Sequence, residues 1–287
     1  MANNMEARNK EFLEQNTLAK LIGCVKEFGA YHNMYCCYTS VDRIEQMMDS
    51  ERQRLWLTKL DAGLFDDGIE HLKYGTESER RRTYIKSFMY GIQESAAMWG
   101  LYCPPTYKAI RMNITQKALE TLLKAKVYRA RKGKNFNVRC KAKIDISDIL
   151  YAAVEDEERK GKRSNVLFWN GVYSKRLKGL SRDKERKCAT GMVKDAEWRF
   201  QNECRLICKT DKDFGDHIAV DLTREFFEGV SFVLSPWASK AEKRLVKDQL
   251  RDCFANIGLD EYADGENVFQ DSKLENGLQK WSTSRGL

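Results

Sequence analysis

The chain lacks the residues and patterns that mark several common classes of protein. It has only three prolines (Pro104, Pro105 and Pro236) and no stretch rich in glycine, serine and proline, which argues against a flexible linker between domains. No apolar run approaches the roughly 20 residues that a membrane-spanning helix needs, and residues 1–15 lack the apolar core of a secretory signal. We therefore expect a cytoplasmic protein with no membrane contact.

Metal-binding and phosphate-binding patterns are also missing. The nine cysteines are an odd number and no CxxC pair faces a matching Cys or His pair, so neither a disulfide framework nor a zinc site is supported. Cys204 and Cys208 fit buried reduced thiols better than metal ligands. The three histidines, His32, His71 and His217, lie far apart, so we expect no metal. Neither GxGxxG nor GxxxxGK[ST] occurs.

Positive charge is concentrated in one segment. The formal net charge is +8, and residues 124–143 hold nine Lys or Arg and no acid, so the rest of the chain nets about −1. With Tyr128 and Phe136 interleaved, this basic strip suits a nucleic acid, because cations neutralise phosphates while aromatic faces stack on bases. A solvated, lysine-rich hairpin is the alternative. The expected nucleic-acid-binding residues are Lys126, Arg129, Arg131, Lys132 and Lys134.

Apolar spacing predicts the secondary structure. An amphipathic helix is expected over Met5–Phe28, within an N-terminal helical extension over 1–30 that precedes a domain over 31–287. Strands are expected at 34–39, 55–57, 83–89, 107–112, 126–130, 138–144, 204–208, 217–220 and 230–234. Helices are expected at 95–102, 115–123, after Ser147 and at 239–254, with a helical turn at 196–200. This irregular order indicates the α+β class.

The triplet Gln201, Asn202, Glu203 stands just before the apolar strand CRLIC. Residues two apart on a strand share a face, so Gln201 and Glu203 would project together into any cleft above that edge. A carboxylate there can accept a hydrogen bond from a sugar hydroxyl and stabilise cationic charge at an anomeric carbon. Arg205 shares the face and would fix Glu203 or bind a phosphate. The alternative is a surface ion pair at a strand start.

Two further motifs place hydroxyl and aromatic groups at the ends of apolar runs. In MYCCYTSVDRI, Tyr38 and Thr39 close a strand. Ser87 ends another strand, and FMYGIQESAAMWGLY then brings Trp99 and Tyr102, three apart on a helix, to one helix face. Each of these side chains has an alternative role in the core or at a helix cap.

Taken with EWRFQNECRLI and VLSPWAS, these motifs resemble, over about Met34–Leu250, the bacterial family labelled domain of unknown function 2971. Typical forms in that family are YTS, SFS with a following MWxxY, and WxxExERL. Its NDP-like acidic loop appears here as FDDG (Phe65–Gly68). The arrangement is also similar to ADP-ribosyltransferases, whose site uses a His, Arg or Tyr strand, a second strand with Ser or Tyr, and a Glu often preceded by Gln or Glu two positions earlier.

The resemblance implies a single α+β domain with a split, mostly antiparallel β-core and peripheral helices, and NAD as substrate. Glu203 and Gln201 would be catalytic, with Glu203 aligning the ribose of NAD and stabilising its oxocarbenium. The first strand carries Tyr38 where an Arg or His is usual. The implied NAD-binding residues are Tyr38, Thr39, Ser87, Trp99, Tyr102 and Arg205.

The sequence therefore predicts a transferase that moves ADP-ribose from NAD onto a nucleic acid, with RNA favoured, in toxin or phage-defence biology. A toxin of this kind implies an inhibitory antitoxin as a partner. The alternative is a nucleic-acid-binding or interaction module without catalysis, supported by the basic strip alone. A nuclease lacks support, because no carboxylate cluster is spaced for two metals.

Overall fold

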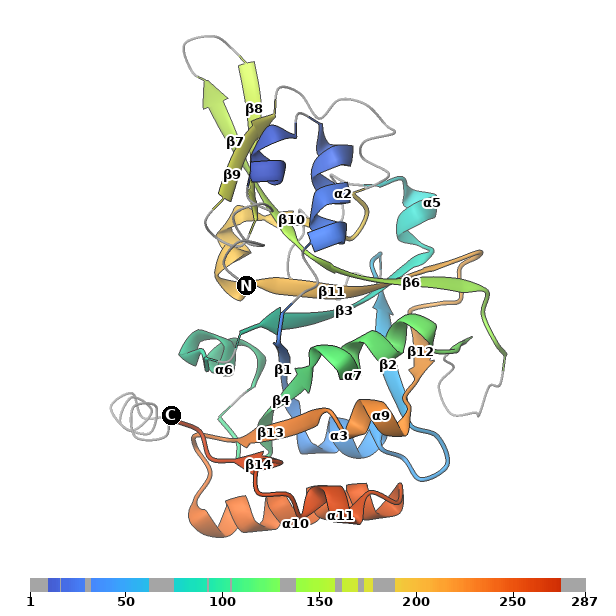
Figure 1. The fold of residues 1–287 in the computed structure, drawn as a ribbon, viewed down its shortest axis with the longest axis vertical. Coiled ribbons are helices and arrows are strands. Elements are labelled where there is room, and N and C mark those ends of the chain that lie inside the picture. Colours follow the sequence, from blue (N-terminus) through green and yellow to red (C-terminus); the bar gives the residue numbers. More distant parts are fainter. Residues whose placement is uncertain are drawn as a thin grey trace. The chain divides into compact units, whose positions relative to one another are not determined.

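The computed structural model describes residues 10–15, 17–28, 32–61, 75–91, 93–103, 105–129, 138–157, 162–169, 173–177 and 189–274 (Figure 1). The chain divides into two compact units, each assembled from three separate segments. The first unit comprises 1–32, 57–89 and 126–219, and the second comprises 33–56, 90–125 and 220–287. Three of the boundaries fall within strands, namely β2 (Arg54–Lys59), β3 (Thr83–Tyr90) and β12 (His217–Asp221).

The first unit is built around β11 (Glu203–Thr210). This strand pairs antiparallel with β3 (Thr83–Tyr90) on one side and with β6 (Ala142–Asp148) on the other. Seven of its eight residues are buried, and these include the charged residues Glu203 and Arg205 as well as the apolar residues of the strand. Because β11 lies between β3 and β6, its first residue, Glu203, lies next to both of these strands.

A second sheet in the first unit overturns one prediction. Its order is β10 (Val193–Asp195), β7 (Leu150–Glu157), β8 (Lys162–Trp169), β9 (Tyr173–Leu177), with β10 parallel to β7 and the other pairs antiparallel. The helix expected after Ser147 is therefore wrong. Short apolar runs have no decisive period, and pairing with β8 selects the extended form of β7.

The N-terminal segment contributes to the core of the first unit. It is helical at 10–14 and again in α2 (Leu18–Phe28), so the continuous helix expected over Met5–Phe28 is interrupted. Thr17 explains the restart, because its hydroxyl accepts a hydrogen bond from the Lys20 backbone N–H at 3.3 Å and caps α2. The buried cluster consists of Phe12, Leu18, Leu21, Ile22, Cys24, Val25, Leu60, Ile85, Leu150, Leu167, Trp169, Ala189, Met192, Val193 and Ile207.

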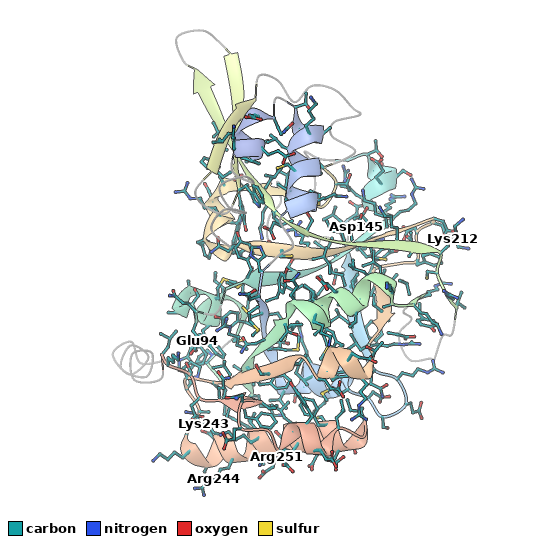
Figure 2. All side chains as sticks on the ribbon, in the orientation of Figure 1. Glu94, Asp145, Lys212, Lys243, Arg244 and Arg251 are labelled. Atoms are coloured by element: carbon teal, nitrogen blue, oxygen red, sulfur yellow. The ribbon has the colours of Figure 1, made fainter. Side chains whose placement is uncertain are left out.

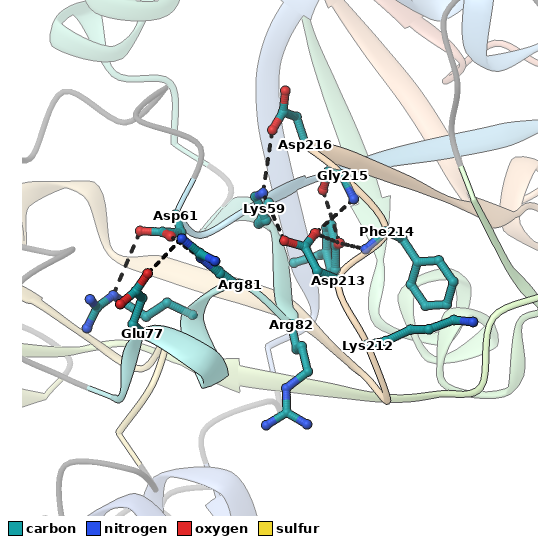
Figure 3. A network of polar contacts seen from close by, with 12 residues as sticks. Lys59, Asp61, Glu77, Arg81, Arg82, Lys212, Asp213, Phe214, Gly215 and Asp216 are labelled. Carbon is teal, nitrogen blue, oxygen red and sulfur yellow. Dashed lines mark hydrogen bonds and ion pairs between the residues drawn. The ribbon is translucent and has the colours of Figure 1, made fainter.

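The turn after β11 is held by a polar network (Figure 3). The buried Tyr84 hydroxyl donates to the Gly215 carbonyl at 3.0 Å and accepts from the Phe214 N–H at 2.8 Å. Lys59 forms an ion pair with Asp213 at 3.5 Å. Nearby, α5 (Glu77–Arg80) begins with a capping box. These contacts fix the end of β11 opposite to Glu203.

The second unit contains a smaller set of strands covered by helices. β1 (Met34–Ser40) pairs antiparallel with β4 (Ala109–Thr115), β4 antiparallel with β13 (Val230–Leu234), and β13 parallel with β14 (Phe269–Gln270). The helical elements are α3 (Val41–Met47), α6 (Ala96–Tyr102), α7 (Gln116–Thr121) with the 3-10 turn η1 (Leu122–Lys124), α9 (Arg224–Phe227), α10 (Lys240–Asn256) and α11 (Asp260–Ala263).

Helix α10 shows why its sequence is helical. Ser239 and Glu242 form a capping box at its start, and its buried face includes Val246, Leu250 and Phe254. Figure 2 labels Lys243, Arg244 and Arg251 along the same helix. The Phe254 ring lies 6.2 Å from that of Phe232 on β13, so α10 contributes an aromatic side chain to the core of this unit.

The α+β class is confirmed, since the described residues combine mostly antiparallel strands with several helices. The expected strands at 34–39, 83–89, 204–208, 217–220 and 230–234 and the helix at 239–254 are present. The division at residue 30 stays a prediction. Within the described ranges, every helix is too short or too polar to cross a bilayer.

Candidate functional site

The residues singled out in the sequence fall into two groups. Ser87, Gln201, Glu203 and Arg205 belong to the first unit. Tyr38, Thr39, Trp99 and Tyr102 belong to the second unit.

The strand register brings Ser87 to Glu203. On the antiparallel pair β3 and β11, Ser87 lies opposite Arg205, and Met89 lies opposite Glu203. Residues two apart on a strand share a face, so Glu203 and Arg205 point the same way. Ser87 therefore lies directly across from Arg205 and diagonally across from Glu203. The Ser87 hydroxyl donates a hydrogen bond to Glu203 Oε1.

The QNE triplet reaches the same place by a different backbone path from the one expected. Gln201 ends the 3-10 turn η2 (Ala196–Gln201), and β11 begins only at Glu203. Between them Asn202 has φ 44° and ψ 59°, a left-handed conformation that asparagine tolerates better than most residues. The helical turn expected at 196–200 is present, and Gln201 belongs to it and not to the strand. Gln201 and Glu203 nevertheless converge on one ammonium group, that of Lys194.

Glu203 is a buried carboxylate, and both of its oxygens accept hydrogen bonds. Only 3% of it is exposed. Oε1 accepts from Arg205 Nε at 2.5 Å as well as from Ser87, and Oε2 accepts from Lys194 Nζ at 3.1 Å. Lys194 also donates to Gln201 Oε1 at 2.8 Å. Arg205 thus fixes Glu203, one of the two roles expected for it.

Electrostatics hold this carboxylate in its ionised form. Burial acts to raise the pKa of Glu203, but the positive charges of Arg205 and Lys194, with hydrogen bonds from Arg205 and Ser87, lower it from 4.5 to about 2. Glu203 is therefore an anion across the physiological pH range. Such a group can accept hydrogen bonds and stabilise a cation, but it cannot act as a general acid near neutral pH.

Backbone contacts add to the rigidity of this cluster. The Glu203 N–H donates to the Tyr151 hydroxyl at 2.8 Å, and the Glu203 carbonyl accepts from the Ile149 N–H at 3.0 Å. Arg205 Nη1 donates to the Gly191 carbonyl at 3.1 Å. The cluster is consequently tied to β7 and to the turn before β10.

Sequence reasoning missed two members of the cluster, Lys194 and Tyr151. Lys194 is 9% exposed and its ammonium lies 5.0 Å from the centre of the Trp198 ring. Nothing local distinguishes Lys194 from the many other lysines of the chain. Tyr151 falls in the helix expected after Ser147, and the structure has β7 there instead. Only the pairing of β10 with β7 brings the two to Glu203.

The second group is an aromatic cluster. Tyr38 and Trp99 meet edge to face with ring centres 4.9 Å apart, and Trp237 packs on Trp99 at 5.9 Å. The Tyr38 hydroxyl accepts from the Ser95 N–H at 3.0 Å, and Trp99 Nε1 donates to Glu94 at 3.1 Å. Glu94 is labelled in Figure 2. Trp99 is fully buried, so its ring is part of the core.

The remaining two residues of this group have different surroundings. Thr39 is 8% exposed, and its carbonyl accepts a hydrogen bond from the Cys103 thiol at 3.3 Å. Tyr102 is 48% exposed, whereas Trp99 is fully buried. Trp99 and Tyr102 are expected on one face of the helix, but the first side chain lies in the core and the second is about half exposed.

Arg111 was not selected from the sequence, although its strand was. It lies directly opposite Tyr38 in the register of β1 and β4, with its guanidinium carbon 5.9 Å from the centre of the Tyr38 ring. Its Nη2 donates to the Gly91 carbonyl at 2.9 Å. Burial raises the pKa of Tyr38 to about 12, against smaller lowering contributions from the Ser95 hydrogen bond and Arg111.

The basic strip is described only at its two flanks. Lys126 and Arg129 are both exposed, while Arg131, Lys132 and Lys134 lie outside the described residues, as does the FDDG loop. The flanks pair, because the Arg129 N–H donates to the Val138 carbonyl at 3.0 Å and the Cys140 N–H to the Val127 carbonyl at 2.8 Å. This is the pairing expected for the arms of a hairpin, with β5 (Val127–Arg129) as one arm.

The eight described cysteines are all buried: Cys24, Cys36, Cys37, Cys103, Cys140, Cys204, Cys208 and Cys253. Among the described residues, no three His, Cys, Asp or Glu side chains gather in a way that would hold a metal ion.

No family model, no curated protein and no solved structure matches this chain. The resemblance to the domain of unknown function 2971 family and to ADP-ribosyltransferases stays a prediction.

Proposed function

We propose that this protein is an ADP-ribosyltransferase that transfers ADP-ribose from NAD to a nucleic acid, with RNA as the favoured target, and that it acts as a bacterial toxin or phage-defence effector. One observation carries the proposal. Ser87 on β3 donates to Glu203 at the start of the adjacent β11, and Gln201 precedes Glu203 by two positions. This is the combination of a Ser strand and a Gln-x-Glu element that the resemblance implies.

The chemistry assigns a clear task to Glu203. The bond between the nicotinamide nitrogen and ribose C1′ breaks, its electron pair leaves with neutral nicotinamide, and a nucleic-acid nucleophile forms the new bond to C1′ and loses its proton to solvent. C1′ carries positive charge during this exchange. An ionised Glu203 would accept a hydrogen bond from a ribose hydroxyl and stabilise that charge. Ser87 and Arg205 would keep the carboxylate in position.

The test compares two carboxylates of the same segment. Purified protein, NAD and RNA are incubated, and released nicotinamide is measured together with ADP-ribose on the RNA by mass spectrometry. Glu203→Gln is expected to reduce nicotinamide release about a hundredfold or more. Glu197→Gln, which changes an exposed carboxylate on η2, is the matched control and should retain wild-type release. Wild-type protein that releases no nicotinamide with any nucleic acid would end the proposal.

A second candidate is a nucleic-acid-binding or interaction module without catalysis. The observation in its favour is that Glu203, 3% exposed and in contact with two cations, has every feature of a structural ion pair. This candidate predicts RNA binding that weakens with salt and survives Glu203→Gln. Neutralising Lys126 and Arg129 together should lower the dependence of log K on log salt by about one to two. Under this candidate no nicotinamide is released.

The restraining partner follows from the first candidate only. A transferase that is toxic to its host requires an inhibitor, and we propose an antitoxin protein for this role. Co-expression with genes adjacent to its own, scored by rescue of growth, would identify such a partner. Growth inhibition that Glu203→Gln does not relieve would argue against a toxic transferase.

A further inference from the structure

Lys194 is the more exposed of the two cations that contact the Glu203 carboxylate. The Lys194 side chain is 10% exposed, against 1% for Arg205 and 3% for Glu203. Glu203 Oε1 accepts from both Arg205 and Ser87, whereas within the described part of the chain Oε2 accepts from Lys194 alone. A ligand hydroxyl that binds Glu203 must therefore arrive at Oε2, on the side where Lys194 lies.

The two cations are attached to the carboxylate in different ways. Arg205 also donates to the Gly191 carbonyl, so its planar guanidinium is held by two hydrogen bonds, one to Glu203 and one to Gly191. Lys194 is a point charge on a flexible four-carbon stem, held by Gln201 at 2.8 Å, by Glu203 at 3.1 Å and by the face of Trp198. Lys194 is consequently the partner that can exchange, while Arg205 remains.

Moving Lys194 away from Glu203 has an electrostatic requirement. Without the carboxylate, its ammonium would keep only an amide oxygen and an aromatic ring, and a poorly hydrated charge without a counter-ion is costly. A ligand that supplies its own anion removes this cost. The ligand that fits therefore carries a hydroxyl for Glu203 and, within reach of a lysine side chain, a phosphate for Lys194.

We propose that Lys194 is the phosphate-binding residue for NAD: a ribose hydroxyl of the substrate takes Glu203 Oε2, and the Lys194 ammonium moves from the carboxylate to a phosphate oxygen of the diphosphate. This inference rests on the proposed function and adds a residue to it. It also identifies the ligand class as nucleotides and excludes unphosphorylated nucleosides as good ligands.

The experiment uses two probes that differ by one phosphate. Isothermal titration of the full chain with nicotinamide mononucleotide and with nicotinamide riboside gives a ratio of affinities, in which general losses of affinity cancel. For wild-type protein we expect the mononucleotide to bind about 10- to 100-fold more tightly, as for a charge-assisted hydrogen bond. Lys194→Met should bring the ratio close to one, and Lys194→Arg should keep a large part of it.

Controls separate the possible failures. Lys212→Met is the matched control, since Lys212 is exposed and also lies over an aromatic ring, that of Phe214, at 5.4 Å, and it should keep the wild-type ratio. Lys194→Gln, which retains a hydrogen-bonding side chain, serves if Lys194→Met does not fold. A wild-type ratio near one, or an unchanged ratio in a folded Lys194 variant, overturns the inference while NAD binding leaves the proposed function intact. Wild-type protein that does not bind NAD overturns both.

Discussion

The two groups of residues bury their polar atoms in opposite ways. Around Glu203, one carboxylate meets two cations and a hydroxyl, so full charges of opposite sign attract one another out of water. Around Trp99, rings fill much of the space, and the Tyr38 hydroxyl and Trp99 Nε1 each make one hydrogen bond. The charged cluster is therefore sensitive to every change, because loss of the carboxylate leaves two buried cations without it, and loss of a donor leaves the buried carboxylate less well compensated. The aromatic cluster loses stability in smaller steps.

The largest effect is expected when the charged cluster loses its anchored cation. Arg205→Met should lower the free energy of unfolding by about 3–5 kcal/mol, because Glu203 keeps its burial with less compensation. The measurement is equilibrium unfolding in urea. The triple variant Lys194→Met, Glu203→Leu and Arg205→Met removes all three charges and should be more stable than the single variant. A triple variant that is less stable than Arg205→Met would contradict the assigned charge compensation.

Acid should act on the charged cluster and not on the aromatic one. The folded pKa of Glu203, about 2, is below its ordinary value of 4.5, so its contribution is complete above pH 4.5 and is lost as pH falls toward 2. The difference corresponds to about 3 kcal/mol. The free energy of unfolding should rise more steeply with pH between 2 and 4.5 in wild-type protein than in Glu203→Gln. Tyr38→Phe should leave this slope unchanged.

Removing one hydroxyl from the charged cluster has a moderate effect. Ser87→Ala deletes a donor to an ionised acceptor, for which a loss of about 1.5–3 kcal/mol is expected. Ser87→Cys keeps a weak donor at the same position and should recover part of the loss. Thermal unfolding of the three proteins at pH 7 gives the comparison. Equal stability of Ser87→Ala and wild type would mean that this hydrogen bond contributes nothing.

The matched change in the aromatic cluster should be the smallest. Tyr38→Phe removes the acceptor of the Ser95 N–H and keeps the ring, so about 0.5–1.5 kcal/mol is expected at pH 7. Because burial raises the pKa of Tyr38 from 10 to about 12, its contribution is complete below pH 10 and is lost as pH rises through 12. The variant should lack this alkaline loss. A larger effect for Tyr38→Phe than for Ser87→Ala at pH 7 would reverse the comparison.

The sequence by itself determined the elements with a clear period and the residues next to them. The strand Glu203–Thr210 and the helix Lys240–Asn256 follow from apolar patterning, and Ser87, Glu203 and Arg205 could be selected because strand geometry limits which side chains share a face. The sequence did not reveal β7, since a short apolar run such as LYAAV satisfies a helix as well as a strand until a neighbour pairs with it.

Only the tertiary structure decided which charges meet. Lys194 and Tyr151 reach Glu203 through the pairing of β10 with β7, and Arg111 reaches Tyr38 through the register of β1 and β4. The left-handed turn at Asn202 sets where the helical turn ends and the strand begins. The physical reason is that local propensity acts over a few residues, whereas a buried charge is balanced by whichever group the packed chain brings to it.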